Sequence, residues 1–292
     1  MVVVTCGSTC AHEVYWGDGG QEERFQAASL SKQFTAATAL LLVEDGTLSL
    51  ADRPADRLPG SPAAWSGITL HHLLSHTSGL PHWDALSEPI GPGAPPSRSD
   101  TVAQVMRMLP LAAPGRRWHY SSPGYVLVAL LIEQTTGRAY ADILRERILD
   151  PLGLAHTGAA QGLVSTTSGV TDPGCLPGAG DLWSTARDLA HWARVLERGG
   201  LLRPASLRRM YTSHATPHAP GFAPLTATGY GYGVFLGALA EHRARFHHGD
   251  NPGYRSLLVR LPERDTTVVI LTRGDGGDLS AILAELFTTP GL

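Results

Sequence analysis

The sequence predicts a fold of the α/β class in its α+β form: an antiparallel sheet made by both chain ends and flanked by helices, with a helical lobe inserted between them. Two observations lead to this prediction. Segments with the composition and alternation of strands lie near both termini and are joined by short turns. The long region between them shows mainly the apolar period of helices. We therefore expect one compact unit with its strands at the chain ends.

Two hairpins are expected, one at each end of the chain. Residues 2–6 and 10–16 are strand-like and flank a turn that contains glycine. Residues 256–261 and 266–272 repeat this arrangement around a turn that begins with proline, and residues 279–287 then have helical periodicity. Both chain ends therefore supply strands to the predicted sheet.

Helices are expected through the middle of the chain. Apolar spacing and stop signals place them at residues 31–45, 68–75, 101–109, 125–136, 141–149 and 185–198. Thr185 and Asp188 have the spacing of a capping box. Stretches rich in proline, glycine and serine predict long loops at residues 87–99, 164–180 and 212–229. We expect a sheet subdomain from residues 1–50 and 225–292, and an inserted, mainly helical subdomain from residues 51–224.

Composition and charge narrow the classes of partner. The chain has 292 residues, a mass of 31.0 kDa and 43% hydrophobic residues, enough to bury a sizeable core. A net charge of -3 and a pI near 6.5 lack the basic excess of proteins that bind nucleic acid or anionic membranes. No apolar run is long enough to span a bilayer. We therefore expect a small-molecule or peptide-like partner.

The compartment is predicted from the first residues and from cysteine usage. The amino terminus has a short apolar patch without the positively charged flank of a secretory signal. Three cysteines, Cys6, Cys10 and Cys175, cannot form a closed disulfide framework, and the odd number fits a reducing compartment. We expect a cytoplasmic protein.

Lysine usage singles out one position. Of the 23 basic residues, Lys32 is the only lysine and the other 22 are arginines. Arginine cannot lose its proton near neutral pH, whereas a buried lysine can act as a base. Ser29 stands three residues before Lys32, so the two are candidates for a nucleophile and its base. The spacing alone is weak evidence, because the base composition of the coding DNA also explains the arginine bias.

The surroundings of Lys32 strengthen this hypothesis. If Ser29 opens the helix expected at residues 31–45, Lys32 lies one turn later on the same face, within reach of the Ser29 hydroxyl. The partial positive charge at the helix amino terminus favours a developing Ser29 alkoxide. The apolar body of the helix would bury the Lys32 ammonium and lower its pKa.

A tyrosine is the candidate for a further proton carrier. Tyr120 stands just before the apolar helix expected at residues 125–136. Held near Lys32, it would ionise or share a proton more readily than free tyrosine. The alternative is an ordinary core tyrosine with a satisfied hydroxyl.

A third cluster precedes the carboxy-terminal hairpin. His247, His248, Gly249 and Asp250 are expected on or beside an edge strand. Gly249 permits close approach of the backbone to a ligand, and a strand N–H beside it can pair with the N–H of Ser29 as an oxyanion hole. Adjacent strand residues point to opposite faces, so at most one of the two histidines should face the site.

In this order, the three clusters resemble the signatures of the serine β-lactamase and penicillin-binding-protein superfamily, in its class C and family VIII carboxylesterase branch. The signatures S-x-x-K, Y-x-N and K-T-G or H-x-G stand here as Ser29-Leu30-Ser31-Lys32, Tyr120-Ser121-Ser122 and His247-His248-Gly249. Similar motifs run through the rest of the chain, for example Leu73-Leu74-Ser75-His76-Thr77-Ser78-Gly79-Leu80.

The resemblance implies a β-lactamase-like fold and a mechanism through an acylated serine. It implies that Ser29 is the nucleophile, Lys32 its activator and Tyr120 the general base and acid. It implies that the N–H groups of Ser29 and Asp250 form the oxyanion hole. The residues that it places around the substrate are Ser122, His247 and Gly249.

Two departures from the family pattern bear on the substrate. His247 stands where β-lactamases have a lysine, so a permanent cation that holds a carboxylate is replaced by an imidazole that is largely neutral at pH 7. This change disfavours β-lactamase or D-Ala-D-Ala-type peptidase activity as the function. Ser122 replaces the family asparagine and loses an amide that both donates and accepts.

Other catalytic constellations are weaker. The G-x-S-x-G run of Ser-His-Asp hydrolases does not occur in the sequence. Four histidines lie close together in sequence without a His-Glu-x-x-His motif or a cysteine pair to complete a zinc site: His71, His72, His76 and His82. We expect neither a metal nor another cofactor.

Three functions remain open from sequence. The first is an esterase or amidase in which water releases the acyl group from Ser29. The second is an acyltransferase that passes the acyl group to an amine or alcohol, as in natural-product biosynthesis. The third is a ligand-binding protein on the same fold without turnover. The expected partner is a small acyl substrate, with an amine or alcohol acceptor for the transferase, and the oligomeric state is open.

Overall fold

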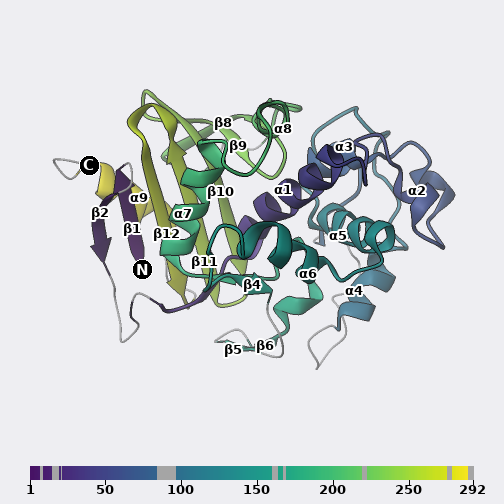
Figure 1. Cartoon of the computed structure of the whole chain (residues 1–292), viewed down its shortest axis with the longest axis horizontal. Helices are drawn as coiled ribbons and strands as arrows, with labels where there is room; N and C mark the ends of the chain where they lie inside the picture. The colour runs from purple at the N-terminus through teal and green to yellow at the C-terminus, as the bar shows by residue number, and fades with distance from the viewer. Residues whose placement is uncertain are drawn as a thin grey trace.

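A computed structural model of the chain has one large sheet with helices on both of its faces and a helical lobe beside it (Figure 1). It describes residues 1–6, 9–14, 20, 22–83, 97–159, 164–166, 169–218, 222–274 and 278–288. In this part of the chain the sheet has seven antiparallel strands. Their order is β2 (Thr9–Val14), β1 (Val2–Cys6), β12 (Thr266–Arg273), β11 (Tyr254–Leu261), β10 (His242–Asn251), β9 (Phe235–Leu239) and β8 (Leu225–Tyr230).

The two ends of the chain meet inside this sheet. β1 pairs with β12, with Val3 opposite Val269. The amino group of Met1 extends this pairing by donating a hydrogen bond of 2.7 Å to the Leu271 carbonyl. The prediction that both ends build one antiparallel sheet is therefore confirmed. Of the strand predicted at residues 10–16, residues 15 and 16 lie outside the described residues.

Alternating side chains of the central strands are covered by a different helix on each face. Val2 and Val4 face a cluster completed by α9 (Leu279–Thr288), which contributes Leu279, Leu283 and Leu286. Val3 and Val269 face the main core, to which α7 (Ala186–Glu197) contributes Leu189, Trp192 and Leu196. The period of two in each strand thus produces two buried faces.

Most of the remaining helices form the lobe beside the sheet, and α1 runs from the sheet into this lobe (Figure 1). They are α1 (Ser31–Glu44), α2 (Pro54–Arg57), α3 (Leu70–Leu74), α4 (Arg98–Val105), α5 (Ser122–Thr136) and α6 (Tyr140–Leu144), which continues as a π-helical turn at Arg145–Leu149. α8 (Pro204–Met210) also contacts α1. Residues 31–42 of α1 are all buried, because the helix is enclosed from both sides. Within the described ranges, no helix is both long and apolar enough to cross a membrane.

Short strands connect the lobe to the sheet. β7 (Leu182–Ser184) pairs with β3 (Phe25–Gln26) and β4 (Gly158–Ala159), and β5 (Val164–Thr166) pairs with β6 (Gly169–Thr171). The division into a sheet subdomain and an inserted subdomain stays a prediction. Within the range expected for the insertion, α7 packs on the sheet.

The region expected as a loop at residues 212–229 instead contains β8. Glycine and alanine have low strand propensity, which hides this strand in the sequence. The glycine in β9 opposite it is required by close packing, because a Cβ at Gly237 would lie 1.8 Å from the Thr226 carbonyl oxygen. Most of the loop expected at residues 87–99 lies outside the described residues, and α4 begins within it at Arg98.

The predicted capping box of α7 is only half formed. The Thr185 side chain accepts a hydrogen bond from the Asp188 N–H at 3.1 Å, as expected for an N-cap. The Asp188 carboxylate does not return to Thr185, since it accepts from the His156 N–H at 3.0 Å and from the Thr157 hydroxyl at 2.8 Å. Asp188 therefore joins α7 to the chain that leads into β4.

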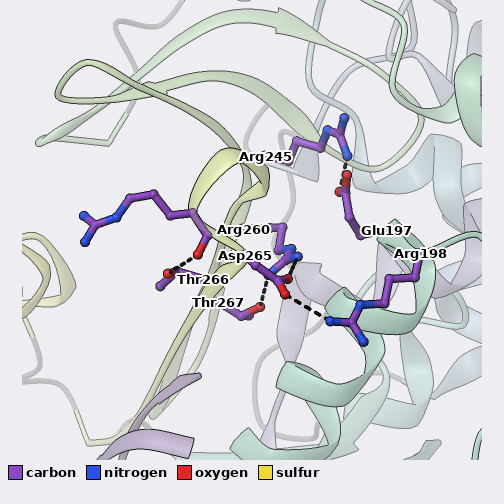
Figure 2. Close-up of polar contacts among 8 residues, drawn as sticks. Glu197, Arg198, Arg245, Arg260, Asp265, Thr266 and Thr267 are labelled. Atoms are coloured by element: carbon purple, nitrogen blue, oxygen red, sulfur yellow. Dashed lines mark hydrogen bonds and ion pairs between the residues drawn. The ribbon is translucent and has the colours of Figure 1, made fainter. Parts of the chain in front are cut away.

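A buried arginine lies at the end of the β11–β12 hairpin (Figure 2). The guanidinium of Arg260, which is 4% exposed, pairs with the Asp265 carboxylate in the connecting turn. Asp265 also accepts a hydrogen bond of 3.0 Å from Arg198, at the end of α7. Beside this group, Arg245 of β10 pairs with Glu197 of α7. These ion pairs fasten α7 to the sheet.

Replacing Asp265 with asparagine is expected to lower the free energy of unfolding by about 1–3 kcal/mol, because buried Arg260 loses its charged partner. Asparagine tolerates the left-handed backbone at this position (φ 48), so the turn itself is spared. Urea denaturation measures the change. Glu263→Gln, in an exposed pair on the same turn, is the control and should leave the free energy of unfolding nearly unchanged. A loss for Asp265→Asn no larger than the control's would contradict this role of Asp265.

Candidate active site

Ser29 lies where the short strand β3 turns into helix α1. Residues Ala28–Leu30 form a 3₁₀ turn between the two elements. Ala28 has a left-handed backbone (φ 47) that residues with a side chain rarely adopt. The Ser29 side chain is half-buried in this turn. Ser29 therefore precedes the first turn of α1 and does not belong to the helix itself.

Lys32 is fully buried one turn after Ser29. Its Nζ donates hydrogen bonds to the Ser29 Oγ at 2.9 Å and to the Ala179 carbonyl at 2.7 Å. Burial lowers the pKa of Lys32 to about 7, while the nearby Asp181 charge acts in the opposite direction. The expectation that the helix buries this lysine and lowers its pKa is confirmed.

Tyr120 lies close to both Ser29 and Lys32. Its hydroxyl is hydrogen-bonded to the side chains of Ser29 and Ser122, and its ring centre is 5.1 Å from the Lys32 Nζ. Burial raises the pKa of Tyr120 above that of free tyrosine, against the smaller effect of these hydrogen bonds. The expectation that Tyr120 ionises more readily was wrong, because loss of solvation outweighs the polar contacts. The phenol keeps its proton near neutral pH.

β10 brings the third cluster beside Ser29. The prediction that these residues lie on or beside an edge strand was wrong, because β10 lies between β11 and β9 inside the sheet. Its pairing with β9 ends at Phe246, however, and the following residues contact the turn that holds Ser29. A Cβ at Gly249 would lie 2.7 Å from the Ala27 carbonyl oxygen and 2.8 Å from the Ala28 Cβ. Only glycine allows this approach.

His247 is buried and its tautomer is fixed by its two partners. The Nδ1 lies 2.7 Å from the His248 carbonyl, which can only accept, so Nδ1 carries the hydrogen. The Nε2 then accepts a hydrogen bond from the Tyr230 hydroxyl at 3.2 Å. Burial holds the pKa of His247 well below its usual value, so the imidazole is neutral. Its ring centre lies 6.1 Å from that of Tyr120, while His248 stacks on Phe222 at 5.3 Å.

Ser122 and Asp250 are the remaining residues that the motifs placed in the site. The Ser122 N–H donates to the His82 Nδ1 at 3.2 Å, and its side chain contacts the Tyr120 hydroxyl. The Asp250 side chain is exposed, 3.7 Å from the Arg255 guanidinium. The residues predicted from the three motifs are thus brought into one region: Ser29, Lys32, Tyr120, Ser122, His247, Gly249 and Asp250.

Sequence reasoning missed residues that hold this region together. His76 is buried and accepts a hydrogen bond from the Ser121 N–H at 3.2 Å, and its ring centre lies 4.4 Å from that of Tyr120, with the two rings tilted by 47°. Asn251 Nδ2 donates to the Gln26 side chain at 2.7 Å and to the Gly180 carbonyl at 3.1 Å. His76 stands in a motif that the family resemblance had already marked, whereas Asn251 carries no local signal.

The histidines considered for zinc have other partners. His71 Nδ1 lies 2.8 Å from the Tyr232 hydroxyl, and His72 Nδ1 lies 3.0 Å from the Thr69 hydroxyl. In the part of the chain that the structure describes, no group of three or more His, Cys, Asp or Glu side chains is arranged to hold a metal ion.

This fold and this arrangement of serine, lysine and tyrosine define the β-lactamase-like class of serine hydrolases. The family model for Beta-lactamase matches residues 3–287, and the chain belongs to that family. It is therefore an enzyme of the serine hydrolase superfamily whose relatives include penicillin-binding proteins and amidases.

Relatives of known name cover most of this chain. Penicillin-binding protein 4* of Bacillus subtilis is 28% identical over 85% of this chain, which spans 60% of that protein. The unguisins hydrolase of Aspergillus campestris is 28% identical over 84% of this chain, which spans 51% of that protein. Among solved structures, a D-stereospecific amidohydrolase from Streptomyces sp. has a TM-score of 0.80 and 27% identity, covering 99% of this chain and 93% of its own. The chain thus spans about half to two thirds of these curated relatives.

Proposed function

We propose that this enzyme hydrolyses a small amide or ester through an acyl-Ser29 intermediate. The observation that supports this best is the hydrogen bond of 2.9 Å between Lys32 and Ser29, made by a lysine whose pKa is lowered to about 7. Near neutral pH, a large share of Lys32 is uncharged and able to take the Ser29 proton. Family membership supports the same chemistry.

In the acylation step, Ser29 Oγ attacks the substrate carbonyl carbon while its proton passes to the neutral Lys32 amine. The N–H groups of Ser29 and Asp250 stabilise the oxyanion that forms. Tyr120, which burial keeps protonated, donates its proton to the leaving nitrogen or oxygen as the bond to carbon breaks. The Lys32 ammonium then returns a proton to Tyr120, which leaves acyl-Ser29 and a neutral amine or alcohol.

In the second step, water attacks the acyl carbon and gives a proton to Lys32. The Ser29 oxygen leaves the acyl group and recovers a proton from the Lys32 ammonium, and the product is a free acid. An amine or alcohol that replaces water in this step would give transfer instead of hydrolysis. Hydrolysis is favoured here because one similar protein is named as a hydrolase and another as an amidohydrolase.

The substrate is proposed to lack a carboxylate that must be held by a fixed cation. His247 occupies the position of the family lysine, and its imidazole is neutral with both nitrogens engaged. This neutral wall suits an amino acid amide or a simple ester better than a β-lactam or a D-Ala-D-Ala peptide, which carry a free carboxylate.

The test compares amides and carboxylate-bearing peptides as substrates. We expect wild-type protein to release ammonia and free acid from D- or L-amino acid amides, and Ser29→Ala to release neither. Added hydroxylamine traps the acyl group as a hydroxamate and measures transfer against hydrolysis. If only D-Ala-D-Ala peptides are cleaved, the substrate proposal is wrong, and if acyl product appears only with the added amine, hydrolysis is wrong.

The rate of acylation is expected to rise with pH and to level off, with a midpoint near pH 7. Below that pH Lys32 is protonated and cannot accept the Ser29 proton, and above it the amine is free. The measurement is kcat/KM for an uncharged ester between about pH 5.5 and about pH 8.5. A profile that is flat or falls over this range would contradict the role of Lys32 as base.

A further inference from the structure

A second buried ionisable group, Asp181, acts on the charge of Lys32. Asp181 precedes β7 and is 3% exposed. Its Oδ1 accepts a hydrogen bond of 3.1 Å from the Gly178 N–H. The carboxylate thereby closes the turn formed by residues 178–181, which follows the loop that leads back to the sheet. The mechanism above does not use Asp181.

Two carbonyl groups of this turn accept hydrogen bonds from the helix that carries Lys32. The Ala179 carbonyl accepts from Lys32 Nζ at 2.7 Å, and the Gly178 carbonyl accepts from the Thr35 hydroxyl at 2.7 Å. The turn ends at Leu182, whose N–H donates to the Ser31 hydroxyl at 3.1 Å. The turn thus contacts three residues of the first turns of α1.

The turn has little freedom to move. Gly178 has a left-handed backbone (φ +69), and a Cβ there would lie 3.0 Å from Ala129 and 3.1 Å from Thr35. This packing fixes the distance between the turn and the helix. A change at Asp181 is therefore transmitted to the acceptor of Lys32 instead of being absorbed by the loop.

The charges around Lys32 leave Asp181 as its counter-charge. Three imidazoles feel the charge of Lys32, those of His76, His247 and His248. Burial holds the pKa of each below its usual value, so all three are neutral. The phenols of Tyr120 and Tyr125 keep their protons for the same reason. Asp181 is the carboxylate whose charge opposes the desolvation of Lys32.

Asp181 itself faces groups on several elements. Burial raises the pKa of Asp181 to about 7, and the backbone N–H groups, Arg98 of α4 and Lys32 of α1 act against this, so Asp181 and Lys32 titrate over the same pH range. Burial raises the pKa of the Tyr140 hydroxyl and of the Cys175 thiol, and the charge of Asp181 adds to both effects. Lys32 is thus both the proposed base of the site and the charge partner of buried Asp181.

We propose that Asp181 is a positioning residue for the acylation step: it closes the turn that holds Lys32 against Ser29, and it supplies the buried counter-charge that sets when Lys32 gives up its proton. The inference rests on the proposed role of Lys32 as base. Asp181 contacts neither the substrate nor Ser29, so it acts through Lys32.

The test uses the fact that Lys32 is the only lysine of the chain. Lysine labelled with carbon-13 at Cε gives a single protein signal, whose shift with pH reports the ionisation of Lys32 without further assignment. In Asp181→Asn the amide oxygen still accepts the Gly178 N–H, while the charge is gone. We expect the Lys32 midpoint to fall by about one pH unit, because loss of an anion destabilises the ammonium. The acid limb of the pH profile of kcat/KM should shift to lower pH by the same amount.

Asp188→Asn is the matched control. Asp188 of α7 also accepts hydrogen bonds from a backbone N–H and a hydroxyl, and it is not among the groups that shift the pKa of Lys32. Loss of the Asp188 charge should change neither the titration midpoint of Lys32 nor the pH of the acid limb of kcat/KM, even if the melting temperature falls. If Asp181→Asn does not fold, Asp181→Ser offers a hydroxyl acceptor to the same N–H and gives the same readout.

The outcomes separate the inference from the function on which it rests. A midpoint and an acid limb that fall together support both. A midpoint that stays in place in a folded Asp181 variant overturns the inference, whatever the activity. A midpoint that falls while the acid limb does not follow shows that Lys32 is not the base, and overturns the proposed function together with the inference.

Discussion

Replacing Lys32 with arginine is expected to lower the rate of Ser29 acylation by about 10³-fold or more. The substitution keeps the positive charge but removes the ability to lose a proton near neutral pH. It also forces a planar guanidinium into a site where Nζ makes one contact to Ser29 and one to the Ala179 carbonyl. The measurement is the rate of mass increase with an activated ester, with circular dichroism to confirm the fold.

The reverse exchange at an exposed site is the control for this variant. Arg138 pairs with Glu146 at the surface, and both side chains are about half exposed. Arg138→Lys should leave the acylation rate unchanged. A Lys32→Arg protein that is acylated at more than about a tenth of the wild-type rate would show that proton transfer to Lys32 is not required.

Replacing Gly249 with alanine is expected to lower the acylation rate by about 10²- to 10³-fold, the loss typical of a damaged oxyanion hole. The added methyl group would lie 2.5 Å from the Ser256 Oγ and 2.7 Å from the Ala27 carbonyl oxygen. Because these atoms belong to β11 and to the turn before Ser29, β10 must move away from Ser29. This movement would separate the N–H groups of Ser29 and Asp250, which we propose as the oxyanion hole.

The same substitution elsewhere provides the comparison. Gly158 in β4 has an ordinary backbone, and a Cβ there would meet only the Arg24 guanidinium at 3.9 Å. Gly158→Ala should therefore keep its acylation rate within about twofold. If Gly249→Ala is acylated as fast as Gly158→Ala, the close approach of β10 is not needed for catalysis.

The sequence predicted those parts of the fold that have strong local patterns. The strand β1 and the hairpin β11–β12 contain apolar runs rich in valine, isoleucine and leucine, and their pairing confirmed the antiparallel sheet made by both chain ends. Strands β8 and β9 were missed, because glycine and alanine give them a weak pattern and their stability comes from pairing with neighbours. Pairing between strands that are distant along the chain cannot be predicted from the sequence of one strand alone.

The site shows the same division between local and tertiary information. The spacing of Ser29 and Lys32 predicted their contact, because both lie within one turn of chain. The raised pKa of Tyr120 could not be predicted, since it depends on how far the surrounding lobe removes the phenol from water. Asp181 was missed because its contacts with α1 arise from a loop that is about 150 residues away along the chain.

The solitary lysine now has a physical explanation in the proposed mechanism. The groups packed around it are neutral imidazoles and phenols, with one buried carboxylate that acts on its charge. An arginine in this position would stay charged, so the preference for arginine elsewhere in the chain stops where a proton must be released.

The central claim is that Ser29 is acylated. The most direct test is intact-mass analysis of wild type and Ser29→Ala after treatment with a fluorophosphonate, followed by peptide mapping of the adduct. We predict one adduct on wild-type protein, located on the peptide that contains Ser29, and none on the variant. Equal labelling of Ser29→Ala, or an adduct on another residue such as Ser122, would contradict the account.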